Sequence, residues 1–194
     1  MILEGRLTNI RCAIRRRLSF LNKPFYKHFG KRALVYKPFL LSGSKNIEIG
    51  DYSFISYGAR IEANKIEGKV PSLKIGKGCS IEQRLHLVCT ESITIGDNCM
   101  ISSNCMINDA IHSLDDINIP YNKQKIISKP ITIGNNVFIG VGSFIMAGTK
   151  LGNNVIVGAN SVVKGEFEDN VMVVGAPARI VKRYNKEKKR WEHV

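Results

Sequence analysis

Four histidines carry the side chain best suited to acid–base chemistry near neutral pH, because the unperturbed pKa of imidazole lies in that range. They are His28, His86, His112 and His193. Three of them lie where a histidine is usually structural or solvated: a basic N-terminal segment, a sequence repeat and the extreme C-terminus. His112 instead stands near the start of a stretch, residues 108–130, that interrupts the repeat. We therefore predict that His112 is a general base.

A general base works best when a second group orients its ring. Three carboxylates lie close to His112 in the sequence, on Asp109, Asp115 and Asp116. Any of them, or a backbone carbonyl, could hold the imidazole, and the sequence leaves these alternatives open.

Five cysteines offer a rival, covalent route through a thiolate, which we discount. Their number is odd and no pair has the CxxC spacing, which argues against a disulfide framework or a zinc site and favours reduced thiols in the cytoplasm. Cys79, Cys99 and Cys105 fall on a small, inward position of the repeat, where a thiol fills core space. We predict no metal site.

The charge of this 194-residue chain is concentrated at its two ends. The formal net charge is +13, of which residues 1–40 contribute +9, residues 41–178 contribute −1 and residues 179–194 contribute +5. A nucleic-acid groove would spread positive charge into the body, so we exclude a nucleic-acid partner. No window is apolar enough for a transmembrane helix, and the N-terminus lacks the apolar core of a secretory signal.

Large aliphatic residues recur every six residues along the body of the chain. A helix requires apolar spacings of three and four, and a simple strand requires two. A period of six fits a flat coil in which each side is a short strand that directs one aliphatic residue inward. These positions are Ile49, Ile55 and Ile61; Ile75, Ile81 and Leu87; Ile95, Ile101 and Ile107; and Ile133, Ile139, Ile145, Leu151, Val157 and Val163. The repeat predicts an all-β protein with a stacked, one-dimensional core.

Glycines that follow the inward residues give the length of one coil. Gly134 and Gly152 are 18 residues apart, which is three hexads and predicts a three-sided prism. Gly96 and Gly134 are 38 residues apart, which we interpret as one coil plus a 20-residue extruded loop within residues 108–130. Long loops in compact domains are usually functional.

The segment ITIGNNVFIGVGSFIMAGTKLGNNVIVGANSVVKGEFEDNVMVVGAPARIVKR, residues 131–183, resembles the hexapeptide-repeat acyltransferases. Its Gly-Ala-Pro-Ala-Arg ending, residues 175–179, is similar to the family's closing motif. The resemblance implies a left-handed parallel β-helix, a homotrimer, and acyl-coenzyme A bound in the groove between subunits. The loop HSLDDINIPYNKQ is most similar to O-acetyltransferases of O-antigen, capsule and exopolysaccharide synthesis.

The resemblance also assigns residues to a site. In the galactoside and xenobiotic acetyltransferases, the catalytic histidine follows the hexad at the offset of His112, which here lies in MINDAIHS. The residues implied to bind coenzyme A are Val141, Ala159, Lys164, Arg179, Lys182 and Arg183. The acceptor would contact Glu82, Gln83, Arg84, Tyr121 and Gln124.

Residues 3–21 have apolar side chains at spacings of three and four, which predicts an amphipathic helix that ends before Pro24. Arginines crowd its other faces. One hypothesis is that residues 1–23 attach peripherally to an anionic membrane. The alternative is a helix that packs on the β-helix or on the trimer.

We therefore divide the chain into a basic N-terminal segment (1–41), a β-helix domain (42–178) and a basic C-terminal tail (179–194). The leading hypothesis is a cytoplasmic, acetyl-CoA-dependent O-acetyltransferase that acts on a sugar of a surface polysaccharide. One alternative is N-acetylation of an amino sugar, because an amine needs the same base. The other is a non-catalytic β-helical scaffold.

Overall fold

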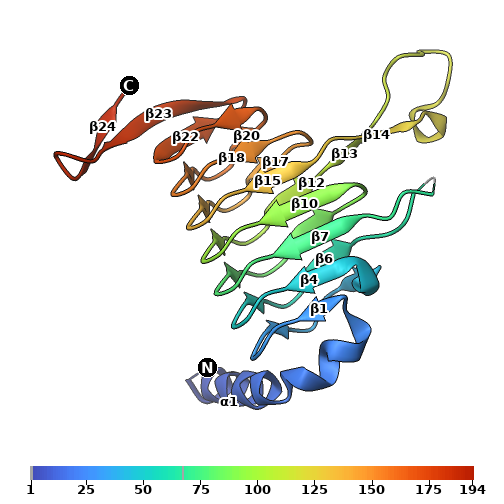
Figure 1. Ribbon diagram of the computed structural model, residues 1–194, viewed down its shortest axis with the longest axis vertical. Coiled ribbons are helices and arrows are strands. Elements are labelled where there is room, and N and C mark those ends of the chain that lie inside the picture. The colour runs from blue at the N-terminus through green and yellow to red at the C-terminus, as the bar shows by residue number, and fades with distance from the viewer. Residues whose placement is uncertain (1, 67) are drawn as a thin grey trace.

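The computed structural model describes the backbone of residues 2–66 and 68–194 and the side chains of residues 10–66 and 68–194. The body is a parallel β-helix, a stack of coils with one short strand on each of three sides (Figure 1). Strands within the stack pair in parallel with strands one coil away. The hexad repeat therefore forms a triangular prism, as predicted.

We call the three sides of the prism sheets A, B and C. Sheet A consists of β1 (His28–Phe29), β4 (Ile47–Ile49), β7 (Ser72–Ile75), β10 (Ser92–Ile95), β15 (Ile131–Ile133), β18 (Lys150–Leu151) and β21 (Glu166–Phe167). Sheet B consists of β2 (Leu34–Val35), β5 (Phe54–Ile55), β8 (Ser80–Ile81), β11 (Met100–Ile101), β16 (Phe138–Ile139), β19 (Ile156–Val157), β22 (Val171–Gly175), β23 (Ala178–Asn185) and β24 (Arg190–His193). Sheet C consists of β3 (Leu40–Ser42), β6 (Arg60–Glu62), β9 (His86–Val88), β12 (Met106–Asn108), β17 (Phe144–Ile145) and β20 (Val162–Val163).

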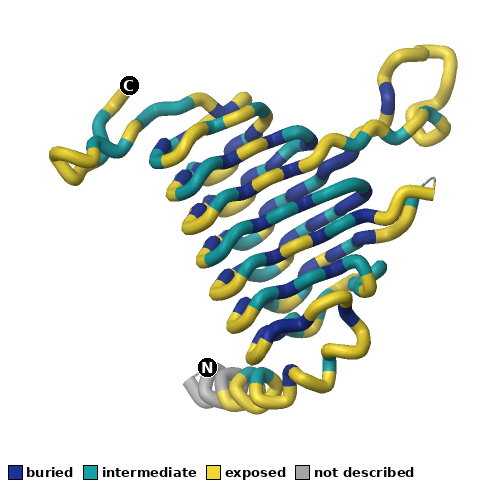
Figure 2. Tube along the Cα trace, in the orientation of Figure 1, coloured by how far each residue is buried: buried dark blue, intermediate teal, exposed yellow. Residues whose placement is uncertain are grey.

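The predicted inward residues form the core, and none of them is more than 3% exposed (Figure 2). The core also extends one coil further toward the N-terminus than the hexad count indicates. Phe29, Val35 and Leu41 lie beside Ile49, Ile55 and Ile61 of the next coil. The first coil therefore lies inside residues 1–41, which the sequence analysis separates from the β-helix.

The A–B corner, from sheet A to sheet B, repeats one turn in coil after coil. It comprises residues 50–53, 76–79, 96–99, 134–137 and 152–155. Asn98, Asn136 and Asn154 have φ between 54° and 57°, the left-handed conformation that asparagine tolerates. Glycine is required for a different reason, because a Cβ on Gly134 would lie 2.6 Å from the carbonyl of Gly152 in the next coil.

The C–A corner, from sheet C to sheet A, is irregular. It comprises residues 63–71, 89–91, 109–130, 146–149 and 164–165, so the departures from an 18-residue coil that the glycine spacing reveals fall here. Residues 109–130 correspond to the predicted extruded loop, residues 108–130, except that Asn108 is the last residue of β12. They contain an antiparallel hairpin of β13 (Ala110–His112) and β14 (Ile126–Ser128), with a 3-10 turn, η3 (Tyr121–Lys123), near the tip.

The N-terminal helix α1 (Ile2–Arg17) lies across one end of the prism (Figure 1). It ends four residues before the predicted Leu21, and the 3-10 helix η1 (Ser19–Phe25) follows and includes Pro24. The buried hydroxyl of Ser19 accepts a hydrogen bond from the Arg32 backbone N–H at 2.9 Å, which ties the chain to the first coil at this point. A further 3-10 turn, η2 (Ser44–Asn46), joins the first two coils. Among the described residues, no helix has the length and apolar composition that spanning a bilayer requires.

The basic C-terminal segment is not a loose tail. β23 turns back along β22, and β24 pairs antiparallel with β23, so the segment extends sheet B at the far end of the stack. Tyr184 and Trp191 pack edge to face on this hairpin, with 5.4 Å between ring centroids.

Candidate active site

The hairpin of the C–A corner presents His112 at the end of β13, opposite Ile126 of β14. The start of this hairpin is held in place by the fully buried carboxylate of Asp109. One oxygen of Asp109 accepts hydrogen bonds from the backbone N–H and the hydroxyl of Thr90, both at 2.8 Å, and the other accepts from the backbone N–H groups of Glu91 and Ser92, both at 2.9 Å. Asp109 therefore clamps the hairpin to the preceding coil and is not available to orient His112.

The imidazole of His112 is exposed, and its Nδ1 lies 3.5 Å from the backbone carbonyl oxygen of Gln124. A carbonyl can only accept, so this contact favours the tautomer in which Nδ1 carries the proton and Nε2 has the free lone pair. Of the alternatives that the sequence leaves open, the Gln124 carbonyl is the group that lies within reach of the ring among the described contacts. Asp115 accepts a hydrogen bond from Ser113, and Asp116 accepts from Asn118.

Gln124 itself holds the loop together. Its side-chain amide donates to the carbonyl oxygens of Asp116 at 2.8 Å and Ile119 at 3.0 Å. These bonds fix the short segment between η3 and β14, whose Gln124 carbonyl faces His112. Gln124 thus has a visible positioning role, whereas Tyr121, the other predicted acceptor residue in the loop, is exposed in η3.

An apolar hollow of about 180 Å³ lies beside His112. Its walls come from the hairpin, from sheet C and from the excursion at residues 63–71, through Ile66, Val88, Thr90, Asn108, Ala110, Ile111 and Ile126. A hollow of this kind can hold a small apolar group next to the base while the exposed side of the ring meets solvent.

The residues implied to bind coenzyme A lie on different parts of one chain. Val141 and Ala159 lie on the B–C corner, which comprises residues 56–59, 82–85, 102–105, 140–143 and 158–161. Arg179 follows at the start of β23, opposite Val174. Lys164 lies instead on the C–A corner, in a small pocket with Ile111 and Ile127 of the hairpin.

The last two basic candidates lie further along β23. Lys182 is opposite His193 of β24. Arg183 forms an ion pair with Glu168, so its guanidinium is already engaged in the single chain.

The three remaining acceptor candidates, Glu82, Gln83 and Arg84, form one turn of the B–C corner. Arg84 has a φ of 59°, and its backbone N–H donates to the Tyr57 carbonyl at 3.1 Å. His112 lies on the C–A corner, across sheet C from this turn. Within one chain, the structure therefore does not bring these residues together with His112.

The outward faces of the three sheets differ in chemistry. The outward row of sheet A is polar or charged, with His28, Glu48, Lys74, Thr94, Thr132, Lys150 and Glu166. The outward row of sheet B is mostly apolar, with Phe54, Ser80, Met100, Phe138, Ile156 and Met172. On sheet C the row changes from Arg60 and His86 to Met106, Phe144 and Val162. Sheets B and C thus expose apolar surface that sheet A does not.

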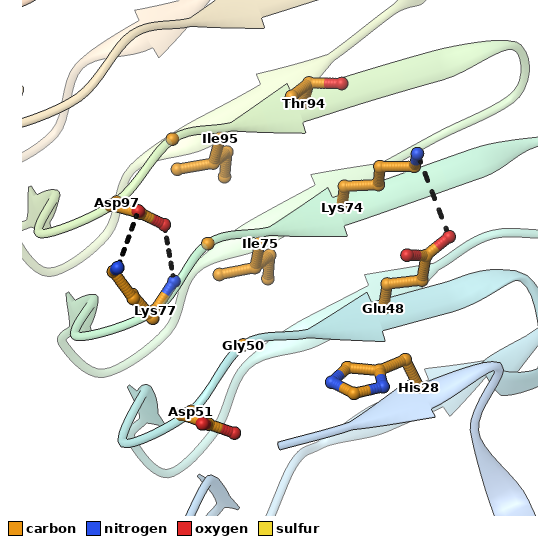
Figure 3. A pocket seen from close by; sticks show the side chains of 12 residues that line it. His28, Glu48, Gly50, Asp51, Lys74, Ile75, Lys77, Thr94, Ile95 and Asp97 are labelled. Carbon is orange, nitrogen blue, oxygen red and sulfur yellow. Dashed lines mark hydrogen bonds and ion pairs between the residues drawn. The ribbon is translucent and has the colours of Figure 1, made fainter. Parts of the chain in front are cut away.

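A wider hollow of about 550 Å³ lies on sheet A and the A–B corner, and His112 is not among its lining residues (Figure 3). Its charged side chains neutralise one another: Glu48 lies 2.8 Å from Lys27 and 4.0 Å from Lys74, and Lys77 lies 3.7 Å from Asp97. The Lys27 hydrogen bond lowers the pKa of Glu48. These pairs link neighbouring coils, and His28 also lines the hollow.

The buried cysteines are hydrogen-bond donors of the core. The thiols of Cys79, Cys99 and Cys105 lie 3.1–3.2 Å from carbonyl oxygens of the next coil. Burial raises the pKa of Cys105, and it raises the pKa of Cys89 to about 12. A protonated, buried thiol is a poor nucleophile, which agrees with the structural role predicted for Cys105. The hydrogen bond with Cys99 instead lowers the pKa of Cys79.

Comparisons with known proteins connect this geometry to a family. The family model for the bacterial transferase hexapeptide (six repeats) matches residues 130–165, and the model for the hexapeptide repeat of succinyl-transferase matches residues 88–109. The chain is 30% identical over 186 residues to WbbJ of Escherichia coli strain K12, named as a candidate lipopolysaccharide biosynthesis O-acetyl transferase; the match covers 89% of this chain and 88% of WbbJ. The chain belongs to the hexapeptide-repeat transferases.

Two solved structures have the same fold. A mutant of AntD, an N-acyltransferase from Bacillus cereus in complex with dTDP and coenzyme A, matches with a TM-score of 0.70 and 23% identity over 87% of this chain and 89% of AntD. VCA0836, an acetyltransferase from Vibrio cholerae O1 biovar eltor complexed with acetyl coenzyme A, matches with a TM-score of 0.59 and 25% identity over 91% of this chain and 85% of VCA0836. The prism is accordingly a left-handed parallel β-helix.

Membership of the hexapeptide-repeat transferases makes the protein an acetyltransferase with acetyl-CoA as its donor substrate. The non-catalytic scaffold alternative is thereby set aside. Within the described residues, no group of three or more histidine, cysteine or acidic side chains is arranged to hold a metal ion.

Some parts of the candidate site were missed by the sequence analysis. The hollow beside His112 uses Ile66, Val88 and Asn108, which come from three different coils. Thr90 links the clamp to β14, because its hydroxyl lies 2.7 Å from that of Ser128. The extra residues at positions 63–71 were a usable signal, since an insertion of that size at the same corner as the loop must lie close to it.

Proposed function

We propose that this hexapeptide-repeat transferase moves the acetyl group of acetyl-CoA to a hydroxyl of a surface-polysaccharide sugar or its precursor, with His112 as the general base. The observation that carries the proposal is the contact between His112 Nδ1 and the Gln124 carbonyl, which leaves Nε2 free beside an apolar hollow. The name of WbbJ, its relative, supports the class of acceptor.

The reaction is a direct transfer. Nε2 of His112 takes the proton of the acceptor hydroxyl as its oxygen attacks the thioester carbonyl carbon. The C–S bond of the resulting tetrahedral intermediate then breaks, and coenzyme A leaves as a thiolate that receives the proton from the imidazolium. The Gln124 carbonyl accepts from Nδ1–H throughout and stabilises the positive charge that develops on the ring.

The donor would extend along the B–C corner. Backbone groups of Val141 and Ala159 would meet the pantetheine amides. Arg179 and Lys182 would meet the phosphates, for which cationic side chains are suited. Lys164, on the C–A corner, would reach them from a second subunit. Arg183 would join them if it exchanged its ion pair with Glu168 for a phosphate.

We further propose that the active enzyme is a homotrimer whose sites lie between subunits. Two observations support this: the apolar outward rows of sheets B and C, which water would otherwise cover, and the separation of His112 from the donor residues on the B–C corner. A neighbouring copy that packs on these sheets would bury the rows and bring the two halves of a site together. Glu82, Gln83 and Arg84 would then contact the acceptor from the second subunit.

The experiment is a thiol-release assay with acetyl-CoA and a panel of sugars that includes amino sugars. We expect turnover with a neutral sugar, and a loss of about 10²–10⁴-fold in kcat for His112→Ala. His193→Ala is the matched control, because it removes another imidazole from the far end of the molecule. Both variants should keep the circular-dichroism spectrum and the particle mass of a trimer.

Three results would count against the proposal. Near-normal turnover by His112→Ala would show that His112 is not the general base. Turnover confined to amino sugars would replace O-acetylation with N-acetylation. Full activity in a monomeric particle would show that the active site is not shared between subunits.

A further inference from the structure

The apolar stripe of α1 faces away from the protein. Ile10, Ile14 and Leu18 follow one another at intervals of four on one side of the helical path, and they are 56%, 52% and 46% exposed. Cys12 and Arg16, on the opposite side, are half-buried. Leu21 and Phe25 of η1 are also exposed. The helix therefore meets the prism with the side that carries Cys12 and Arg16. Of the stripe, only Leu18 borders the prism, at a hollow that it shares with Leu34 and Val35.

Two arginines fix this orientation. The guanidinium of Arg15 lies 5.2 Å from the ring centroid of Tyr36, and that of Arg16 lies 5.2 Å from the ring centroid of Phe54. Cation–π contacts of this length are attractive. Ser19, where α1 has ended, is hydrogen-bonded to the first coil through Arg32. The apolar stripe of α1 thus points outward because the arginines on the other face of the helix contact the prism.

The same end of the molecule is rich in unbalanced positive charge. Between Glu4 and Glu48 the sequence has no acidic residue, but it has eleven cationic ones: Arg6, Arg11, Arg15, Arg16, Arg17, Lys23, Lys27, Lys31, Arg32, Lys37 and Lys45. A hollow of about 450 Å³ is lined by Arg16, Arg17, Ser19, Phe20, Lys23, Lys31 and Arg32. Among the described side chains, the five cations of this hollow are not within ion-pair distance of a carboxylate.

We infer that this end of the protein docks on the surface of an anionic lipid bilayer. Ile10, Ile14 and Leu18 would enter the boundary between headgroups and acyl chains. The cations of the hollow other than Arg16, which stacks on Phe54, would meet lipid phosphates. An exposed aliphatic stripe bordered by arginine and lysine suits such a surface, because both kinds of side chain find their preferred surroundings there. The inference goes beyond the proposed function and does not depend on it.

Charge decides against a second copy of this chain as the occupant. A copy docked by the same end would bring two sets of unbalanced cations together, which is unfavourable. A nucleic acid would meet the cations but would offer no apolar phase to the stripe. The hairpin that carries His112 lies on the side of the stack and projects away from α1, so docking leaves it accessible (Figure 1).

The test is flotation of the full-length protein with vesicles of phosphatidylcholine, with or without phosphatidylglycerol. We expect the protein to float only with the anionic vesicles at low salt, and to bind more weakly as salt rises. Lys23→Gln/Lys31→Gln/Arg32→Gln should weaken partitioning about 100-fold, because each cation near an anionic surface adds to the attraction. Ile10→Gln/Ile14→Gln/Leu18→Gln should weaken it by at least about 10-fold.

The matched control is Lys186→Gln/Lys188→Gln/Lys189→Gln, which removes three charges from the hairpin at the other end of the stack. It should partition as the unmodified protein does. Failure of the unmodified protein to float at low salt would overturn the inference, as would an equal loss in the control. A stripe variant that floats normally but has a lower particle mass would show that the stripe packs between subunits instead.

Discussion

The A–B and C–A corners of the prism differ in regularity. At the A–B corner, each coil repeats the one below it, and side-chain oxygens accept hydrogen bonds from backbone N–H groups of the preceding coil. Asp97, Asn135, Asn153 and Asp169 do so in succession, at 2.7–2.9 Å. At the C–A corner, turns of 2 to 22 residues replace this ladder.

The difference shows how a repeat protein separates stability from chemistry. A ladder that recurs in every coil stabilises the stack one interface at a time, and it tolerates little change because coils approach closely. An irregular corner adds no such ladder, but its insertions can place a hairpin, a clamp and a hollow beside one another. The candidate site therefore lies at the C–A corner, where the repeat is interrupted. The regular A–B corner holds the scaffold in place.

The largest effect on stability is expected at the regular corner. In Gly134→Ala, the new Cβ would lie 2.6 Å from backbone atoms of Gly152, so the coils must move apart. We expect a loss of about 3 kcal/mol or more in the free energy of unfolding, because backbone atoms and not a flexible side chain must move. Denaturant unfolding monitored by circular dichroism measures it.

The same substitution at the irregular corner is the control. Gly165→Ala meets no atom within 4 Å, and its φ of 115° leaves a backbone strain of about 1–2 kcal/mol as the cost of the substitution. If the two variants lost equal stability, close approach between coils would not explain the glycines of the A–B corner.

An intermediate effect is expected at the clamp of the C–A corner. Asp109→Asn replaces one carboxylate oxygen with an NH₂ group that faces backbone N–H donors, at a cost of about 1–3 kcal/mol. The hairpin base should loosen, and kcat should fall about 10-fold or more while the KM for acetyl-CoA stays constant. Steady-state kinetics on the folded variant measures kcat and the KM for acetyl-CoA separately.

Asp116→Asn is the matched control, since that carboxylate accepts only from Asn118 in the exposed loop among the contacts described. Its stability should stay within about 0.5 kcal/mol. A clamp variant that kept the full kcat would mean that His112 is positioned by β14 alone.

The prism was predictable from the sequence because its core is periodic. Aliphatic residues at intervals of six and glycines at intervals of 18 leave few alternatives. The first coil was missed although Phe29, Val35 and Leu41 also have a spacing of six. An aromatic residue at the first position and the high density of lysine and arginine concealed the repeat, which became visible only as strands paired with β4, β5 and β6.

The candidate site was only partly predictable, for a physical reason. His112 was marked by its position after the last hexad before the loop. The group that orients it is a backbone carbonyl, which every residue has, and Asp109 acts through backbone N–H groups of another coil. Such contacts depend on how an insertion folds, and no periodicity encodes that. The acceptor candidates Glu82, Gln83 and Arg84 remain a prediction that only an assembly can test.

The smallest effect concerns His86, on the strand that leads into the C–A corner. Its Nε2 is buried without a hydrogen-bond partner, and burial, followed by the charge of Arg60, lowers the pKa below the ordinary value of 6.5. Below pH 6.5, His86 of the unfolded chain therefore binds a proton that His86 of the folded chain does not bind. The folded state accordingly loses stability as the pH falls from 6.5 through the lower pKa of His86 in the folded state. The melting temperature of His86→Gln should thus decline less than that of the unmodified protein between about pH 7.5 and pH 5.5, by at most about 2 °C. Equal declines would show that the His86 ring is hydrated in solution and that burial does not lower its pKa.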